Sequence, residues 1–295
     1  MATLGISLFV LGFALGPLIW APLSELYGRQ VIFLISYGGF TAFNAGAAGA
    51  QNIKTLLILR FFAGAFGSSP FTNSGGVIAD IFDASERGLA MGTFALAPFL
   101  GPTIGPIVGG YISENASWRW IEGVMAIFSG VLWIVVCLLV PETFAPVLLR
   151  ARAAKLSRLT GKVYKSRLEI DQGHLTVTEI FTTTLSRPFA LLFKEPIVLL
   201  LSIYLAIVYG TLYMMFGAYP IVFQQGRGWG TGKGGLAFIG IAVGMLIAGI
   251  LIFPANKRYM SKVAETPFGR LPPEERLVAG MIGSVFIPIG IFCTA

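Results

Sequence analysis

Apolar residues dominate eight long stretches of this chain, and charged residues gather in the segments between them. Each stretch is long enough for a helix to cross a hydrocarbon core of ~30 Å, which takes about 20 residues. The predicted spans are residues 3–23, 31–50, 55–79, 89–112, 119–140, 196–223, 235–254 and 277–295. The pattern therefore predicts an all-α polytopic membrane protein.

The composition agrees with a membrane protein and argues against a soluble domain. Only 12% of the residues are charged and the mean hydropathy is +0.79, whereas soluble domains carry about 25% charged residues. The net charge of +7 is spread over short blocks between apolar stretches, as in loops beside anionic lipid. We expect a lipid bilayer as a partner, and no nucleic acid.

Residues that support catalysis or metal binding are sparse. Both cysteines, Cys137 and Cys293, lie in apolar stretches, and the only histidine, His174, stands alone in a polar loop. No nucleotide-binding or zinc-site pattern is present. The sequence therefore predicts no enzyme, no cofactor and no metal site.

The distribution of Lys and Arg predicts which loops face the cytoplasm. Of the 21 basic residues, sixteen lie in one set of alternate loops and four in the opposite set. Because cytoplasmic loops are enriched in Lys and Arg, the side with sixteen is expected to be cytoplasmic. Its loops are residues 24–30, 80–88, 141–195 and 255–276.

The longest loop divides the predicted helices into two groups. We expect an N-terminal helical half at 1–140, a cytoplasmic linker at 141–195 and a partial C-terminal half at 196–295. Met1 would then lie outside with no positive flank, and the last stretch ends at Ala295 with no polar flank. The simplest interpretation is an interior fragment whose first half lacks its first helix.

The fourth apolar stretch contains the most distinctive local pattern. Glycines at four-residue intervals let a neighbouring helix approach closely, and prolines bend a helix by removing backbone donors. One segment combines both features at Gly101, Pro102, Gly105, Pro106, Gly109 and Gly110. We expect tight packing of this bent helix, and simpler contacts of the same kind at Gly12 and Gly240.

Three segments, in order along the chain, resemble motifs of the major facilitator superfamily. The first resembles its cytoplasmic loop motif, with Gly28 and Arg29 matching and Glu25 replacing an aspartate. The second resembles the fourth-helix motif around Arg60, and the third matches the antiporter motif of the fifth helix. These segments are residues 21–30, 56–64 and 101–110.

Four further sequence segments resemble those of fungal drug:proton antiporters with twelve helices. They are Trp118-Arg119-Trp120, Pro141-Glu142-Thr143, the basic stretch 148–158, and residues 272–277. The resemblance implies the major facilitator fold of two six-helix halves, here incomplete at both ends and covering about helices two to nine. It also implies transport of small organic molecules.

Arg60 is the only charge that we place inside a predicted span, because Arg119 and Glu122 stand at the start of the span 119–140. A charge near the bilayer centre costs at least a few kcal/mol, so Arg60 is expected to face a cavity or a partner. The resemblance implies a role in proton coupling. The alternative is a side chain that extends to the nearby membrane surface, since Arg60 follows Thr55 by only five residues.

The first motif predicts a charge cluster that gates the cytoplasmic side. Glu25, Gly28 and Arg29 stand in one loop, and Asp80 and Arg87 stand in the next loop on that side. A pair between Arg29 and Asp80 would tie two helices together across the face that must open. The alternative is a solvated loop, where an exposed pair contributes under about 1 kcal/mol.

A cavity for a drug-sized molecule needs apolar walls and a few polar groups. The candidates are Asn44, Asn73, Glu122, Tyr209 and Tyr213, with Ser68, Ser69 and Thr72. Most of them fit ordinary hydrogen bonds between helices equally well. Glu122 stands beside two tryptophans, where an interfacial carboxylate needs no special role.

The stretch 147–168 interleaves leucines with seven basic residues. Leu149, Ala153, Leu156 and Leu159 fall on one face of a helix. This segment either lies on anionic lipid or forms a solvated linker, and the residues leave both interpretations open.

The leading hypothesis is a proton-coupled antiporter of the plasma membrane that exports drugs, toxins or polyamines by alternating access. Its expected partners are a small organic substrate, protons and the bilayer. The alternatives are uptake of a sugar-like nutrient, and a truncated membrane protein without transport activity.

Overall fold

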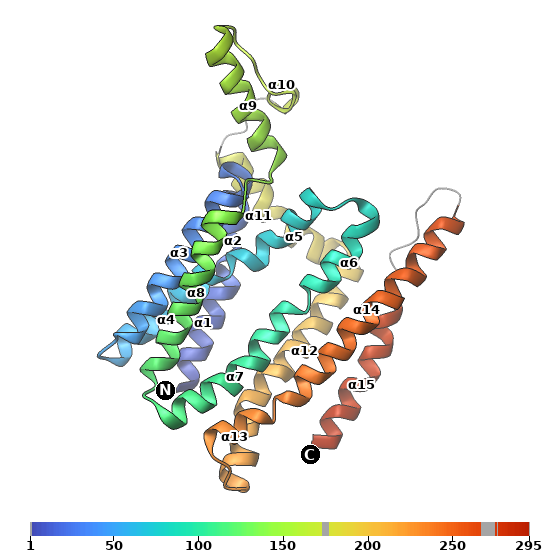
Figure 1. Cartoon of the computed structure of the whole chain (residues 1–295). Coiled ribbons are helices and arrows are strands. Elements are labelled where there is room, and N and C mark those ends of the chain that lie inside the picture. Colours follow the sequence, from blue (N-terminus) through green and yellow to red (C-terminus); the bar gives the residue numbers. More distant parts are fainter. Residues whose placement is uncertain (1, 173–176, 267–274, 276, 295) are drawn as a thin grey trace. The chain divides into compact units, whose positions relative to one another are not determined.

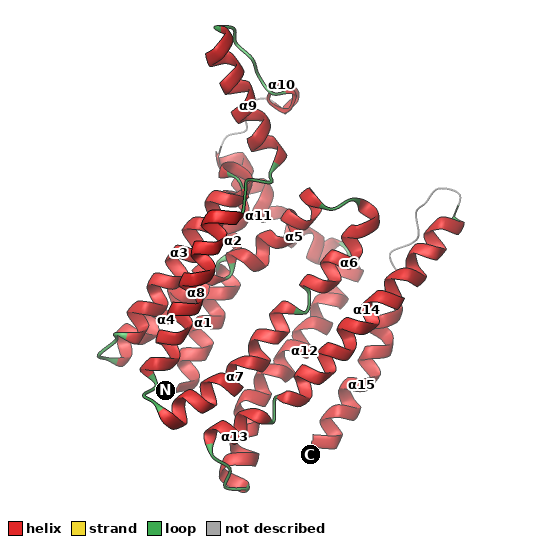
Figure 2. Ribbon diagram, in the orientation of Figure 1, coloured by secondary structure: helices red, strands yellow, loops and turns green. Residues whose placement is uncertain are grey.

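The computed structural model describes residues 2–172, 177–266, 275 and 277–294, so His174 lies outside the described part. Every regular element in that part is helical (Figure 1, Figure 2). The chain forms two compact units. Unit 1 holds residues 1–81 and 115–199, and unit 2 holds residues 82–114 and 200–295.

Unit 1 is built around four helices that lie side by side in Figure 1, namely α1, α3, α4 and α8. Helix α1 packs on α4, and α3 packs on both α4 and α8. The helices of this unit are α1 (Ala2–Leu15), α2 (Pro17–Tyr27), α3 (Arg29–Ala48), α4 (Ile53–Gly67), α5 (Ser69–Ile81), α8 (Arg119–Leu139), α9 (Ala145–Thr160), α10 (Arg167–Gln172) and α11 (Val177–Lys194).

Glycines explain how closely α1 approaches α4. A Cβ at Gly12 would collide with the carbonyl oxygen of Phe61, and a Cβ at Gly64 would collide with that of Phe9. Helices in a bilayer associate through such close packing, because lipid provides no hydrophobic driving force. The close contact predicted at Gly12 is therefore present.

Polar side chains join α3 to α8. The hydroxyl of Thr41 donates to Ser129 Oγ at 3.2 Å, and Trp133 Nε1 donates to the Leu34 carbonyl oxygen at 2.9 Å. Since hydrocarbon offers no hydrogen-bonding partner, these bonds help to fix the two helices side by side.

Unit 2 combines helices from the middle and the end of the chain. Helix α6 packs on α14, where a Cβ at Gly92 would lie 3.2 Å from Ile252. This contact groups α6 and α7 with the later helices, although the linker 141–195 separates them in the sequence. The elements are α6 (Ala84–Phe94), α7 (Ala97–Asn115), α12 (Pro196–Tyr219), the π-helix η1 (Pro220–Gly226), α13 (Thr231–Leu236), α14 (Ile239–Glu265) and α15 (Val278–Thr294).

Six helical segments of the described part are long and apolar enough to cross a membrane. They are Leu4–Tyr27, Arg29–Ala48, Glu86–Asn115, Arg119–Leu139, Pro196–Gly226 and Thr231–Glu265, and they correspond to six of the eight predicted spans. The predicted span 55–79 is divided at Ser68 into α4 and α5. The predicted span 277–295 holds α15, whose apolar part is shorter. The all-α membrane fold class is confirmed.

Candidate functional site

Arg29, at the start of α3, lies among polar side chains of α2 and α5. Its Nη1 donates to Ser24 Oγ at 2.7 Å and to Asn73 Oδ1 at 3.4 Å, and its Nε lies 3.7 Å from Asp80 Oδ2. Gly76 leaves room for the guanidinium, because a Cβ there would lie 2.7 Å from Arg29 Cζ. The expected pair of Arg29 with Asp80 is present, and it joins α3 to α5.

The carboxylate of Glu142 caps the start of α3. One oxygen accepts the N–H of Arg29 at 3.0 Å and the other accepts the N–H of Gln30 at 3.1 Å. The first N–H groups of a helix lack partners within the helix, and the helix dipole favours an anion beside them. Gln30 Nε2 also donates to the Val140 carbonyl oxygen at 2.9 Å. The segment after α8 thereby holds the α2–α3 turn.

Gly28 suits this turn for two reasons. Its backbone has φ 95° and ψ 165°, a region that is essentially restricted to glycine. A Cβ at this position would also collide with the Glu142 carboxylate. On the other side of the turn, Arg29 Cζ lies 4.9 Å from the centre of the Phe144 ring, within the range of a cation–π contact.

The other two members of the predicted charge cluster have different partners. Glu25 accepts a hydrogen bond from Thr184 Oγ1 at 3.0 Å, which links α2 to α11. Arg87 belongs to unit 2, where it donates to the Phe82 carbonyl oxygen at 3.4 Å. The cluster around Arg29 is thus built from α2, α5 and the segment after α8.

Arg60 and Glu122 form an ion pair between α4 and α8. Glu122 is buried with 5% of its surface exposed, and the Arg60 side chain is 32% exposed. Helix α4 packs against α1 and α3, whose segments are both of membrane-spanning length. The pair therefore lies in the helical bundle of unit 1, where the carboxylate offsets the cost of burying the guanidinium.

This pair changes two expectations. Arg60 was expected to be the sole charge within the spans, and Glu122 was expected to be an interfacial carboxylate without a special role. Instead Glu122 lies in the first turn of α8, buried against Arg60. The two residues are 62 positions apart, so no local pattern connects them.

The proline–glycine segment forms most of α7, which continues through Pro102 and Pro106. Among the described residues, no atom lies within 4 Å of a Cβ built at Gly101, Gly105 or Gly109. The described helices of unit 2 therefore leave this glycine row open. Thr103 beside it is buried and donates to the Phe99 carbonyl oxygen at 2.8 Å.

The end of α7 contacts α13 instead. A Cβ at Gly110 would lie 2.7 Å from the Thr231 carbonyl oxygen. Ser113 Oγ lies 3.4 Å from Thr231 Oγ1, and Glu114 accepts the N–H of Gly232 at 3.1 Å. We call these interactions the α7–α13 contact. By the predicted topology it lies on the non-cytoplasmic side.

The predicted cavity residues are distributed over both units. Asn44 donates to the Phe40 carbonyl oxygen of its own helix at 2.7 Å, while Asn73 is part of the Arg29 cluster. In unit 2, Tyr209 stacks on Phe99 with ring centres 4.7 Å apart. The other candidates are Ser68, Ser69 and Thr72 near the α4–α5 junction, Tyr213 on α12, and Glu122, which pairs with Arg60. In unit 1, Asn73 Nδ2 donates to Ser69 Oγ at 3.2 Å and Thr72 Oγ1 donates to the Ser68 carbonyl oxygen at 3.1 Å, so these residues bond to one another near the start of α5.

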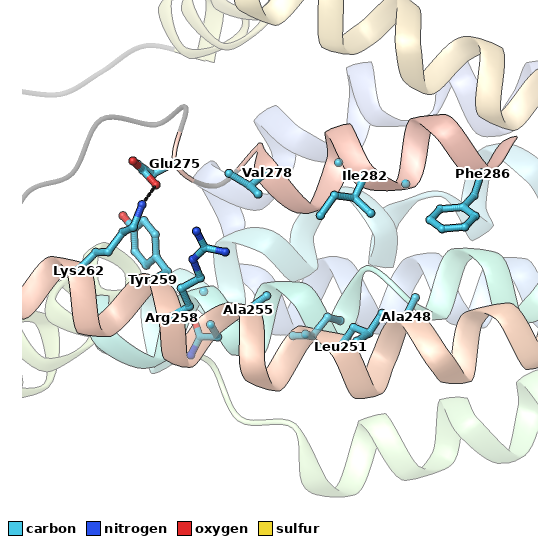
Figure 3. A pocket seen from close by; sticks show the side chains of 15 residues that line it. Ala248, Leu251, Ala255, Arg258, Tyr259, Lys262, Glu275, Val278, Ile282 and Phe286 are labelled. Atoms are coloured by element: carbon cyan, nitrogen blue, oxygen red, sulfur yellow. Dashed lines mark hydrogen bonds and ion pairs between the residues drawn. The ribbon is translucent and has the colours of Figure 1, made fainter.

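A cavity of about 640 Å³ lies between α14 and α15 of unit 2 (Figure 3). Its walls are mainly apolar, with Leu251 on α14 facing Ile282 and Phe286 on α15. Lys262 and Glu275 form an ion pair of 2.5 Å at one end. None of the predicted cavity residues lines this space, and no motif in the sequence marks it.

Comparison with known proteins decides the family. The sequence matches the Major Facilitator Superfamily over residues 1–295. The chain belongs to the major facilitator superfamily. The MFS-type efflux pump MFS2 of Trichophyton rubrum is 63% identical over 290 residues, which are 98% of this chain and 49% of that protein. The multidrug transporter mdrA of Aspergillus fumigatus is 62% identical, over 99% of this chain and 48% of that protein.

A third relative, the efflux pump FUB11 of Gibberella fujikuroi, is 55% identical over 99% of this chain and 51% of its own length. The chain thus spans about half the length of the curated relatives it matches. The resemblance to fungal exporters of the major facilitator superfamily is confirmed. Family membership and six membrane-length helices identify an integral membrane protein.

For a major facilitator protein, the two charge sites offer different chemistry. The Arg29–Asp80 pair is largely buried, with 13% and 23% of the two side chains exposed, and its charged atoms lie 3.7 Å apart without a hydrogen bond. The Arg60–Glu122 pair contains a buried carboxylate, and a proton on that carboxylate removes the negative charge that balances Arg60. The first site joins two helices through opposite charges, and the second holds a buried carboxylate beside its counter-ion.

Proposed function

We propose that this protein exports small organic molecules, such as drugs, toxins or polyamines, in exchange for protons by alternating access. The Arg60–Glu122 ion pair carries the proposal, because it combines a titratable group and its counter-ion inside a bundle of apolar helices. The names of the relatives, efflux pump and multidrug transporter, support export. A plasma-membrane location is part of the same proposal.

Protonation of Glu122 would drive the conformational change. The neutral acid no longer balances Arg60, and an unpaired cation in the membrane costs a few kcal/mol. Arg60 then moves toward water or toward another partner, and α4 shifts relative to α8. A proton that crosses the membrane supplies ~2.3 kcal/mol per 100 mV, which is similar in size to this cost.

The Arg29 cluster would form the cytoplasmic gate. Arg29 Nε lies 3.7 Å from Asp80 Oδ2, which is attraction without a hydrogen bond, so the gate would open without breaking a hydrogen bond between these two groups. Glu142 keeps the start of α3 in place while Asp80 moves away with α5. Glu25 would connect the gate to α11 through its hydrogen bond with Thr184. Arg87 would take part in the gate from α6.

The open glycine row of α7 supports the antiporter interpretation. A row without side chains lets another helix approach when the transporter changes conformation. The α7–α13 contact would then separate as the non-cytoplasmic side opens. Tyr209 and Tyr213 would contribute aromatic side chains from α12 to the substrate cavity.

Energised efflux from cells that lack their own exporters tests the proposal. The complete gene product is expressed, and loss of a fluorescent substrate is followed with and without a protonophore. We expect efflux that stops when the proton gradient collapses and in the Arg60→Ala variant, although this variant still inserts. The matched control is Lys54→Ala, an exposed residue of the same helix, which should retain efflux.

Two results would contradict the proposal. Normal pH-driven efflux by Arg60→Ala would exclude the coupling role of the ion pair. Energised accumulation in place of loss would favour uptake of a nutrient over export.

A further inference from the structure

Helix α9 carries a charge pattern that the proposed function does not use. Helix α9 follows α8, which is a helix of membrane-spanning length. The five-residue extended linker Val140–Phe144 connects the two helices. Residues 145–168 contain seven basic residues and no Asp or Glu. They are Arg150, Arg152, Lys155, Arg158, Lys162, Lys165 and Arg167.

Large apolar side chains lie exposed among these charges. Leu156 is 48% exposed, Leu159 is 74% exposed, and Val163 just beyond the helix is 86% exposed. Leu148 and Leu149 near the start of α9 are also exposed. A solvated linker has no need for such a row of leucines, whereas a helix at a membrane surface uses them to reach the acyl chains.

The described protein leaves this surface uncovered. Figure 1 shows α9 standing clear of the helices of unit 1, with α10 beside it, and no described helix packs extensively against α9. Its polar contacts are with the segment that follows it, where Ser157 Oγ accepts the N–H of Tyr164 at 2.8 Å. The helix is therefore free to lie against another surface.

We infer that α9 binds anionic phospholipid at the surface of the membrane that α8 spans. Charge complementarity identifies the ligand, because four cations of α9 and three more in the seven residues that follow it, with no acid among residues 145–168, match an anionic headgroup layer beside a membrane span. Each cation near such a surface strengthens binding by a factor of about five. Lys and Arg stems reach the headgroups while Leu156 and Leu159 enter the boundary of the acyl chains.

Fluorescence quenching from the lipid tests this inference. The complete gene product, with native cysteines changed to serine and a fluorophore on Thr160→Cys, is reconstituted in nanodiscs that contain a lipid-borne nitroxide quencher. We expect strong quenching with phosphatidylserine and weak quenching with phosphatidylcholine alone. High salt should reduce it, since the Debye length falls from ~8 Å at 0.15 M to ~3 Å at 1 M.

Two variants, each with four positive charges removed, distinguish the effect of α9 from the effect of positive charge elsewhere in the protein. The test variant carries Arg150→Gln, Arg152→Gln, Lys155→Gln and Arg158→Gln, and should lose surface binding several hundredfold, because four factors of about five multiply to about 600. The control carries Arg187→Gln, Lys194→Gln, Lys257→Gln and Arg258→Gln, which are exposed outside α9, and should retain it.

Three outcomes would overturn the inference. These are equal quenching in both lipids, an equal loss of quenching in both variants, and no quenching in any lipid. The last result would indicate a solvated linker or a protein partner. Because no transport is measured, the test does not depend on whether export is the correct function.

Discussion

Replacement of Gly28 by alanine tests how the cytoplasmic cluster is held together. In the structure, the Glu142 carboxylate occupies the space that a Cβ at Gly28 would need. The same carboxylate caps α3 through the N–H groups of Arg29 and Gln30. Gly28→Ala should therefore strain the turn and displace the cap at the same time.

The expected loss of stability is about 3 kcal/mol. Alanine at φ 95° and ψ 165° costs ~2 kcal/mol of backbone strain, and loss of a charged cap costs ~1 kcal/mol. Gly161→Ala is a matched control. Gly161 also has a positive φ, of 69°, but no neighbouring atom lies within 4 Å of its Cβ position, so only ~1 kcal/mol of left-handed strain is expected.

Heating followed by size-exclusion chromatography of the detergent-solubilised protein measures this difference. Gly28→Ala should lower the apparent melting temperature about three times as much as Gly161→Ala. Combined with Glu142→Ala it should lower the temperature by less than the sum of the single changes, because both remove one cap. Equal shifts for the two glycine variants would refute the role of Glu142 in the turn.

Two further predictions concern topology and the α7–α13 contact. Cysteines at Ser157 and Ser261 should resist impermeant thiol reagents in intact cells, because their loops belong to the basic side, and labelling of both from outside would reverse the orientation. Ser113→Cys with Thr231→Cys, whose hydroxyl oxygens lie 3.4 Å apart, should cross-link on oxidation and lose efflux until reduced. Full efflux in the cross-linked state would show that this contact does not open during transport.

The fold could be predicted from the sequence because the bilayer leaves few choices. A polar backbone in hydrocarbon must satisfy its own hydrogen bonds, so long apolar stretches become helices, and six of eight were found at membrane-spanning length. The division at Ser68 was not predicted, since apolar character continues from α4 into α5. Likewise, the association of α6 with α14 depends on packing between distant helices.

The site could be predicted only where the charges stand in neighbouring loops. Arg29 and Asp80 were paired from the sequence because both occupy loops on one side of the membrane. Glu142 was not connected to Gly28, because 112 or more residues separate it from the N–H groups that it caps. Sequence spacing cannot reveal such a contact without the intervening helices in place.

The sequence predicts that the glycine row of α7 packs against a helix, and the described helices of unit 2 leave that row open. Spacing shows that Gly101, Gly105 and Gly109 share a face, but it does not show which neighbour covers that face. In the structure the contact forms through Gly110, on a different side of the helix.

Proton movement through the purified, reconstituted protein tests the central claim most directly. Proteoliposomes with a pH-sensitive dye inside are given a substrate gradient, and the resulting proton flux is recorded for the unaltered complete protein, Arg60→Ala and Glu122→Gln. The account predicts substrate-dependent proton flux in the unaltered protein and none in either variant. Undiminished flux in Glu122→Gln, which cannot bind a proton at this carboxylate, would contradict it.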